Sequence, residues 1–316
     1  MAWWLWSISS LICGILALLL IFKSEVFPAA TANTKILVGL GFFAYYPTFV
    51  NSSYGQVTLF LFLISTLAWL ALRAEKNLSA GCWLGIAASF KPFFGLFLST
   101  VLISRNWRAV GAFLVVCGLC FLLGGLVLGF SAYNAYFAML GEVNWLTTSW
   151  NSSFTGFFVR IFSGSDHNVW IDDPMLGRQF ARGCALLLVI AMSAVIYKQS
   201  LSADRKLRAD TLMALTIPAM LLLSPLGWMY YFSLLFINVL VVWNLTAELA
   251  NGRIYRLLLL LVTIPTLPAR PLSYSVHTPR VWFWDAGVFF YLLVFMFSVT
   301  AFLAYQACNK ISTGKT

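Results

Sequence analysis

The sequence predicts an all-α, polytopic membrane protein, and three observations carry that prediction. Of the 316 residues, 61% are hydrophobic and only 9% are charged, a balance that excludes a soluble globular domain. Apolar runs close to the ~20 residues that a helix needs to cross a bilayer recur along the chain. Basic residues gather in the short segments between those runs, where they indicate orientation. We treat residues 1–316 as a single transmembrane domain.

The elements follow from the apolar runs in chain order. Three runs have the length of a full span: residues 2–22, 109–130 and 286–305. Six shorter runs fit helices that are buried within the bundle or that cross a locally thinned bilayer, namely residues 36–50, 57–72, 182–197, 211–223, 229–247 and 256–267. The sequence therefore predicts about nine spans.

Residues 79–104 decide the topology, because this stretch is long enough to cross but carries Lys91-Pro92 at its middle. If it re-enters and returns to the same side, 14 Lys and Arg lie on one face and five on the other, with Lys91 completing the 20. If it crosses, the counts become nine and ten. The positive-inside rule favours a re-entrant helical pair, and a proline after Lys91 fits a break in a helix.

This topology places Met1 and four loops outside the cytoplasm, at about residues 51–56, 131–182, 224–228 and 268–285. The net charge of +10 then records orientation, and we predict no nucleic-acid partner. The six cysteines lie mostly in apolar segments without metal-ligand spacing, which argues against a disulfide framework or a zinc site. The chain has no Walker motif to indicate ATP hydrolysis.

Polar groups at membrane depth are unfavourable unless they are paired or used, so their positions are the main functional signal. The first cluster is "NSSYGQ", residues 51–56, ahead of an apolar run. Helix capping explains its Asn and Ser, but it does not require the amide of Gln56. The second cluster is Lys91-Pro92, where a mid-membrane lysine must find a carboxylate, a phosphate or water, or else snorkel to the near interface.

The third cluster is "NSSFTGFFVR", residues 151–160. If this stretch is helical, Asn151, Thr155 and Arg160 lie near one face, so that amide, hydroxyl and guanidinium groups could donate to one anion. The alternative is an interfacial arginine that meets lipid headgroups.

The fourth cluster is "LSPLGWMYYF", residues 223–232. Ser224-Pro225 ends one helix at the outer surface, and Trp228, Tyr230 and Tyr231 open the next. An aromatic belt at the membrane interface would explain the tryptophan and tyrosines without any further function.

Candidate metal ligands are sparse. His167 and His277 are isolated in outer loops, and Asp172-Asp173 lacks a nearby histidine or a third carboxylate. We predict no metal site and identify no cofactor, and we leave open whether a divalent cation is used.

Taken in order, the four clusters resemble glycosyltransferase family 87, whose members have the GT-C fold and use polyprenyl-phosphate-linked sugars. The matching stretches are "YGQ" at residues 54–56, "SAGCWLGIAASFKPFFGLFL" at 79–98, "NSSFTGFFVRIF" at 151–162 and "LSPLGWMYYFSLLF" at 223–236. The resemblance covers roughly residues 36–245, and the ordered set is more specific than any one stretch.

The resemblance implies a GT-C-like helical bundle that transfers a hexose, such as mannose, from polyprenyl phosphate to an extracytoplasmic lipid or glycan acceptor. An Asp deprotonates the acceptor hydroxyl, polyprenyl phosphate leaves, and the anomeric configuration inverts. The protein would lie in a bacterial inner membrane, and its partners would be the sugar donor, the acceptor and membrane lipids.

The resemblance also implies a substrate site. Arg160 is the first candidate and Lys91 the second for the leaving phosphate, which requires fixed donors and positive charge. The other candidates would orient the sugar or phosphate, stack on the sugar or line the lipid groove: Gln56, Asn151, Ser153, Ser224, Trp228, Tyr230 and Tyr231.

Two departures from the family pattern bear on activity. The family commonly has a His pair where this chain has Tyr230-Tyr231, and tyrosine does not normally titrate near neutral pH. Family members also begin with an additional helix and an outer loop that bears the catalytic Asp, which we expect upstream of Met1. The alternatives are an inactive relative that acts as a subunit, a transporter of a lipid-linked sugar, or a substitute carboxylate among Glu142, Asp172 and Asp173.

Overall fold

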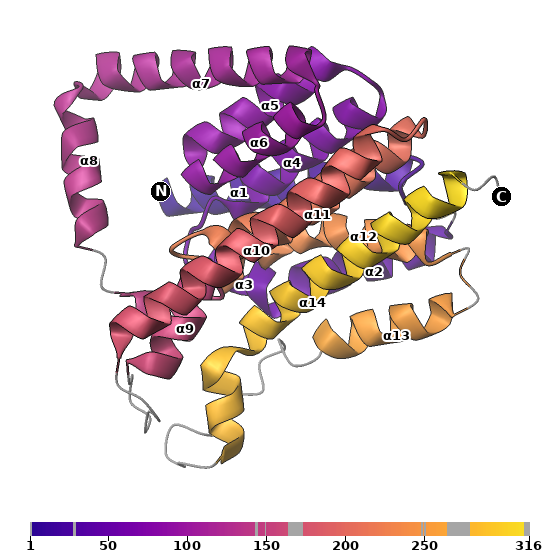
Figure 1. The fold of residues 1–316 in the computed structure, drawn as a ribbon. Coiled ribbons are helices and arrows are strands. Elements are labelled where there is room, and N and C mark those ends of the chain that lie inside the picture. The colour runs from indigo at the N-terminus through magenta and orange to yellow at the C-terminus, as the bar shows by residue number, and fades with distance from the viewer. Residues whose placement is uncertain are drawn as a thin grey trace.

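In the computed structural model, the residues described are 2–27, 30–142, 145–148, 150–163, 173–247, 249, 251–263 and 279–312. As predicted, they are nearly all helical, with one isolated β-bridge and no strand among them (Figure 1). The elements are α1 (Ala2–Lys23), α2 (Ala32–Ala44), α3 (Tyr46–Ser53), α4 (Thr58–Arg73), α5 (Asn77–Phe90), η1 (Pro92–Gly95), α6 (Leu96–Ile103), α7 (Trp107–Leu128), α8 (Ser131–Gly141), η2 (Trp145–Thr147), α9 (Phe154–Phe162), α10 (Pro174–Ser200), α11 (Arg205–Leu223), η3 (Met229–Leu234), α12 (Leu235–Leu245), α13 (Gly252–Thr263) and α14 (Pro279–Ser312).

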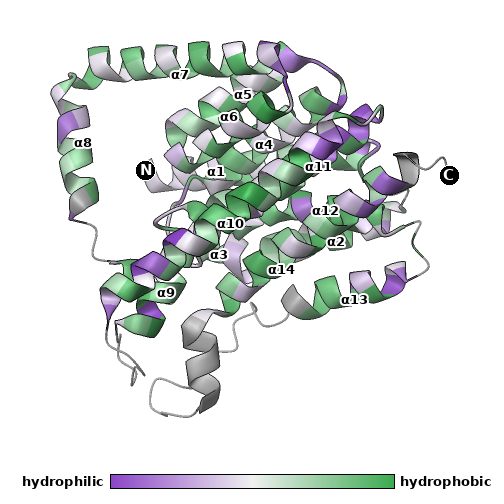
Figure 2. Ribbon diagram, in the orientation of Figure 1, coloured by the Kyte–Doolittle hydropathy of each residue, from purple (hydrophilic) through white to green (hydrophobic). Residues whose placement is uncertain are grey.

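Within the described residues, four helices are long and apolar enough to cross a membrane: Ala2–Lys23, Trp107–Leu128, Pro174–Ser200 and Gly287–Asn309. The protein is therefore a multi-pass membrane protein by length and composition, and the nine spans remain a prediction. Figure 2 shows hydrophobic residues along α7 and α10 and hydrophilic ones near the ends of the bundle. Large apolar side chains such as Leu123 and Val127 are exposed on α7, a surface that suits contact with lipid.

Two predicted segments differ from the structure. The run at residues 36–50 is divided between α2 and α3, which meet at Tyr45. Pro47 lies in the first turn of α3 and has no N–H to continue the preceding helix, so the break follows from that proline. The predicted outer loop at residues 131–182 contains α8, α9 and the first turns of α10, which apolar length alone does not reveal.

Helix α11 lies at the centre of the bundle, where every residue from Thr211 to Leu222 is buried (Figure 1). Pro218 removes the N–H that would bond to the carbonyl of Ala214, four residues earlier. Asn238 of α12 supplies the missing donor, since its Nδ2 donates to that carbonyl at 2.6 Å and to Thr300 Oγ1 of α14 at 2.9 Å. One amide therefore joins three helices and satisfies a buried carbonyl.

Helices α5 and α7 pack backbone to backbone because α5 has small residues at the contact. A Cβ on Gly81 would lie 2.3 Å from the carbonyl oxygen of Ala109, and one on Gly85 would lie 2.8 Å from that of Phe113. This close approach sets the N-terminal ends of the two helices side by side.

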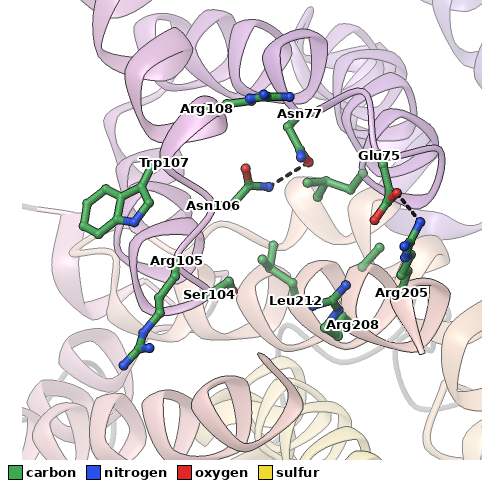
Figure 3. Close-up of a pocket in the computed structure, with 12 residues that line it drawn as sticks. Glu75, Asn77, Ser104, Arg105, Asn106, Trp107, Arg108, Arg205, Arg208 and Leu212 are labelled. Atoms are coloured by element: carbon green, nitrogen blue, oxygen red, sulfur yellow. Dashed lines mark hydrogen bonds and ion pairs between the residues drawn. The ribbon is translucent and has the colours of Figure 1, made fainter. Parts of the chain in front are cut away.

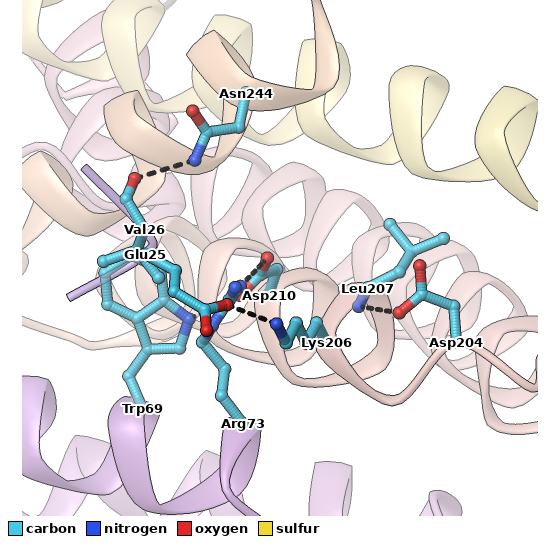
Figure 4. Close-up of polar contacts among 9 residues, drawn as sticks. All are labelled: Glu25, Val26, Trp69, Arg73, Asp204, Lys206, Leu207, Asp210 and Asn244. Atoms are coloured by element: carbon cyan, nitrogen blue, oxygen red, sulfur yellow. Dashed lines mark hydrogen bonds and ion pairs between the residues drawn. The ribbon is translucent and has the colours of Figure 1, made fainter. Parts of the chain in front are cut away.

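Polar contacts gather the basic connecting segments at one end of the bundle (Figure 4). Arg73 pairs with Asp210, and Lys206 pairs with Glu25. The last turn of α12 joins the same end, since Asn244 Nδ2 donates to the carbonyl of Val26 at 2.8 Å. These segments belong to the face that the charge count grouped together.

The hairpin α5–η1–α6 returns to the end where it began. Asn77, the first residue of α5, and Ser104, just after α6, line the same cavity. The chain therefore reverses at Lys91, which is the turn that a re-entrant pair requires.

Candidate functional site

The four polar clusters of the sequence meet around η3, at the opposite end of α11 from the basic segments. Thr48 of α3 is hydrogen-bonded to Ser233 of η3, with 2.9 Å between the two hydroxyl oxygens. Lys91 lies over the ring of Tyr231, and Asn151 forms the isolated antiparallel bridge with Trp228. Residues that are far apart in sequence are thus brought to one place in the fold.

Asn151 holds the third and fourth clusters together. Its Nδ2 donates to the carbonyls of Leu146 at 3.1 Å and Pro225 at 2.9 Å, and its Oδ1 accepts from the N–H groups of Ser153 at 3.2 Å and Gly227 at 3.0 Å. The side chain is fully buried. These four bonds use the donors and acceptors of the amide on the backbone of two loops, so its direct role is to position them.

The bridge backbone and Gly227 complete this contact. Ser152 N–H donates to the carbonyl of Gly227 at 2.8 Å, and Met229 N–H donates to that of Trp150 at 3.0 Å. A Cβ on Gly227 would lie 2.3 Å from the carbonyl oxygen of Leu221, so a side chain does not fit there. The glycine of the Ser-Pro-x-Gly-Trp stretch is therefore required by packing.

Helix α9 begins at Phe154, so the stretch at residues 151–160 is helical only from that residue onward, and Asn151 lies outside the helix. Ser153 is the N-cap, and its Oγ accepts from Gly156 N–H at 3.0 Å. A Cβ on Gly156 would lie 2.5 Å from Asn151 Cγ, so this glycine admits the amide against the helix. Asn151 and Arg160 therefore do not share a helical face.

Arg160 reaches back from α9 to the preceding loop. Its Nη1 donates to the carbonyls of Thr148 at 2.7 Å and Asn151 at 2.8 Å. The residue is 7% exposed, which places its charge inside the protein and not among lipid headgroups. Arg160 thus stabilises the loop and adds positive charge beside it.

Lys91 caps the C-terminus of α5 in an extended conformation, as expected for the residue before a proline. Its Nζ lies 5.7 Å from the ring centroid of Tyr231, and Phe93 contacts the same ring with centroids 4.9 Å apart. Within the described part of the chain, the Lys91 ammonium has no carboxylate or hydrogen-bond acceptor. A half-buried cation therefore faces η3 with its charge unneutralised by these residues.

The first cluster lies against η3 but does not cap α4 in the expected way. Val57 is the N-cap and supplies no side-chain bond, whereas Asn51 Oδ1 accepts from Thr58 N–H at 3.2 Å. Asn51 Nδ2 and Thr58 Oγ1 are fully buried and have no hydrogen-bond partner in the described residues. Gln56 is half-buried, and its side-chain amide has no hydrogen bond to any described residue. Thr58 escaped the sequence analysis because it opens an apolar run.

Aromatic rings form one side of this region. Trp228 stacks with Tyr230 at a centroid distance of 6.0 Å, and Tyr230 meets Tyr231 edge-on at 4.8 Å. Tyr54 and Trp150 pack at 5.6 Å, which joins the first cluster to the third. Flat aromatic faces of this kind offer apolar area on which a ring or an apolar chain can pack.

The remaining candidates occupy supporting positions. Ser224 caps the end of α11, and its Oγ accepts from Leu226 N–H at 3.3 Å. Asp173 is the N-cap of α10 and accepts from Met175 and Leu176, while Glu142 is exposed after α8. Asp172, His167 and His277 lie outside the described residues.

No group of three His, Cys, Asp or Glu side chains suited to a metal ion occurs among the residues that the structure describes.

Comparison with known proteins identifies one family. A model of glycosyltransferase family 87 matches residues 1–225, which is more than half of the chain. The match includes Gln56, Lys91, Asn151, Arg160 and Ser224 and ends before η3. No curated protein and no solved structure matches the chain significantly.

Proposed function

Because the chain belongs to glycosyltransferase family 87, we propose that it transfers a hexose from a polyprenyl-phosphate donor to a lipid or glycan acceptor. The family implies a membrane glycosyltransferase. The donor, the acceptor, the inverting course and an extracytoplasmic site in a bacterial inner membrane are parts of the proposal. So are the nine spans, with the re-entrant pair that carries Lys91 toward the site.

One observation supports this proposal most directly, namely the half-buried Lys91 ammonium beside η3, where the four clusters meet. A departing phosphate develops negative charge, and a fixed cation in a region of low dielectric stabilises that charge more than it would in water. We assign Lys91 to the leaving phosphate. Arg160 adds positive charge from the loop at residues 148–151.

The sugar and lipid have separate surfaces in this proposal. Gln56 is placed to hydrogen-bond the sugar or phosphate, and the Trp228–Tyr230 pair offers faces for the sugar or the first isoprene units. Tyr231 is buried and supports this surface from within, beside Lys91. Asn151, Ser153 and Ser224 position these groups through the loops that they cap and join.

The acceptor hydroxyl requires a general base within hydrogen-bond reach. Asp173 already caps α10 and Glu142 is exposed, so we do not assign the base to either carboxylate. The proposal places the base on an Asp of the kind that other family members carry in an outer loop.

The test is a transfer assay in membranes that contain the full chain, with radiolabelled polyprenyl-phosphate hexoses as donors. Lys91→Gln removes the proposed phosphate ligand and should lower turnover by about 10²-fold, the usual effect of losing one group that stabilises developing charge. Lys23→Gln is the matched control, because Lys23 is exposed near the other end of the bundle, and it should leave turnover unchanged.

Two results would contradict the proposal. Equal turnover in the Lys91 and Lys23 variants would remove Lys91 from the reaction. Donor binding by the wild type without transfer to any acceptor would instead support the carrier or subunit role. Arg160→Ala is a less direct test, because it also removes two bonds that hold the loop.

A further inference from the structure

A polar cavity lies at the other end of α11, among the starts of three helices (Figure 3). Its volume is about 460 Å³. The cavity lining on α11 ends at Leu212, and the 11 residues from there to Leu223 span roughly 16 Å at about 1.5 Å of rise per residue, which separates the cavity from η3. We call it the arginine cavity, and it is not part of the site around η3.

The lining of the arginine cavity is strongly basic. Arg105, Arg108, Arg205 and Arg208 line it together with one carboxylate, Glu75, so four positive charges and one negative leave a formal charge of +3. Figure 3 shows Arg108 of α7 on one side and Arg205 and Arg208 of α11 on the other, while Arg105 extends away.

Only one of these arginines is neutralised by a described residue. Arg205 pairs with Glu75, and both side chains are well exposed. The guanidinium groups of Arg105, Arg108 and Arg208 have no carboxylate or hydrogen-bond acceptor in the described part of the chain. Each guanidinium presents a planar fork of N–H donors that suits phosphate oxygens, and the unpaired groups of Arg108 and Arg208 come from two different helices, α7 and α11.

The N-termini of three helices add positive electrostatic potential to the charge of the arginines. Asn77, Trp107 and Arg205 are the first residues of α5, α7 and α11, and all three line the cavity. An N-terminal helix end carries about half a positive charge. Asn106 caps α7 by accepting from Ala109 N–H, and Asp204 caps α11 by accepting from Leu207 N–H. Asn106 Nδ2 donates to Asn77 Oδ1 at 2.8 Å, which fixes two starts together, and α5 has no side-chain cap of its own.

From the cavity, its net charge and its unpaired arginines, we propose that it binds a phosphate-bearing anion. Arg108 and Arg208 hold the phosphate from α7 and α11, and the amide pair Asn77–Asn106 lies between the helix starts. A phospholipid headgroup and a soluble phosphate compound present the same chemistry. This site is independent of the function proposed above.

The experiment measures binding of inorganic pyrophosphate to the purified full chain in nanodiscs of phosphatidylcholine, by titration calorimetry. Arg108→Gln with Arg208→Gln should weaken binding about tenfold or more for each charge-assisted bond lost. Arg178→Gln with Arg182→Gln is the control, because it removes the same charge from two exposed arginines of α10 that do not line the cavity. It should leave affinity within about twofold, since distant exposed charges are screened by salt.

Nanodiscs that contain phosphatidic acid then separate the two sources. Competition of this lipid with pyrophosphate in the wild type, lost in the arginine variant, identifies a lipid headgroup as the ligand. Undiminished pyrophosphate binding in the same nanodiscs identifies a soluble phosphate compound. Absence of binding by both probes, or equal weakening in the arginine variant and the control, overturns the proposal. A matching melting temperature for both variants shows that the arginine variant remains folded.

Discussion

The two ends of α11 use polar side chains in opposite ways. At the η3 end, Asn151 and Ser153 are fully buried, and both are hydrogen-bonded to the backbone. At the other end, Arg108 and Arg208 line a cavity without an acceptor among the described residues. In this protein, a buried polar side chain with several hydrogen-bond partners fixes a loop, whereas a polar side chain without such partners is available to bind a ligand. The number of hydrogen-bond partners therefore distinguishes the two roles.

Both kinds of polar side chain also occur together at the η3 end. Asn151 holds two loops, whereas the Lys91 ammonium lies over the Tyr231 ring and has no hydrogen bond or ion pair within the described chain. The residues that fix the backbone and those that remain open to a substrate are therefore neighbours. Substitutions should separate them into effects on stability and effects on transfer.

Replacing Asn151 tests whether its buried hydrogen bonds stabilise the fold, and it should have the largest effect on the free energy of unfolding. Asn151→Ala should lower the free energy of unfolding by about 4 kcal/mol, from about 1 kcal/mol for each of its four hydrogen bonds. Denaturant titration in detergent measures this. Asn33→Ala, an exposed asparagine in the first turn of α2, is the control and should be nearly neutral.

A small loss in Asn151→Ala, comparable with that of Asn33→Ala, would contradict the assignment of this amide as the joint between two loops. Asn151→Asp sharpens the result, because it keeps the acceptor for Ser153 and Gly227 and removes the two donations.

The ion pairs at the basic end test whether burial decides strength there as well. Asp210→Asn should lower the free energy of unfolding by about 3 kcal/mol, because it leaves Arg73 without its carboxylate in a site where both side chains are mostly buried. Trp69 also donates to that carboxylate at 2.7 Å. Glu75→Gln breaks the exposed pair with Arg205 and should change stability by about 1 kcal/mol or less.

The same titration measures both variants. If the two variants lose equal stability, burial does not determine the strength of these ion pairs. The distinction between side chains that stabilise the fold and side chains that are available to a ligand would then not apply at this end of the bundle.

The smallest expected effect concerns Glu25, an exposed carboxylate at the same end. The hydrogen bond and charge of Lys206 lower the pKa of Glu25 below its ordinary value of 4.5. A carboxyl group with a lowered pKa contributes stability above its unfolded pKa, and the contribution is lost as the pH falls through the folded pKa. Wild type should therefore melt slightly higher than Glu25→Gln at pH 7, and the difference should disappear at about pH 3. A difference that persists at low pH would exclude this ion pair as its source.

Much of the helix order could be predicted from apolar length. The first span, α4 and α7 lie close to their predicted ranges, because a bilayer requires about 20 apolar residues and loops require polar ones. The break between α2 and α3 was not predicted, although Pro47 signals it. Helix α8 was not predicted, since it is too short to register as a span, and the stretch that contains α9 was considered helical only as one alternative.

The candidate site could be predicted as a set of clusters but not as a set of roles. Chain order and residue type indicate that Gln56, Lys91 and Arg160 belong together, and family membership is confirmed by the match over residues 1–225. The partners of Asn151 include a residue 76 positions away, and no local pattern reveals them. The arginines of the cavity were interpreted in the sequence only as a signal of membrane orientation. That they lie together depends on the packing of α5 against α7, which the sequence pattern does not reveal.

The bridge between Asn151 and Trp228 also sets an order of events during synthesis. Its two residues are separated by α9, α10 and α11, so Asn151 must wait for its partner until both long helices, α10 and α11, have been made and inserted. Until the ribosome has passed Met229, the backbone of residues 150–152 lacks the partners that it has in the finished protein. A chain that is stalled or truncated before that point should keep this loop open to proteolysis, even with its membrane helices in place.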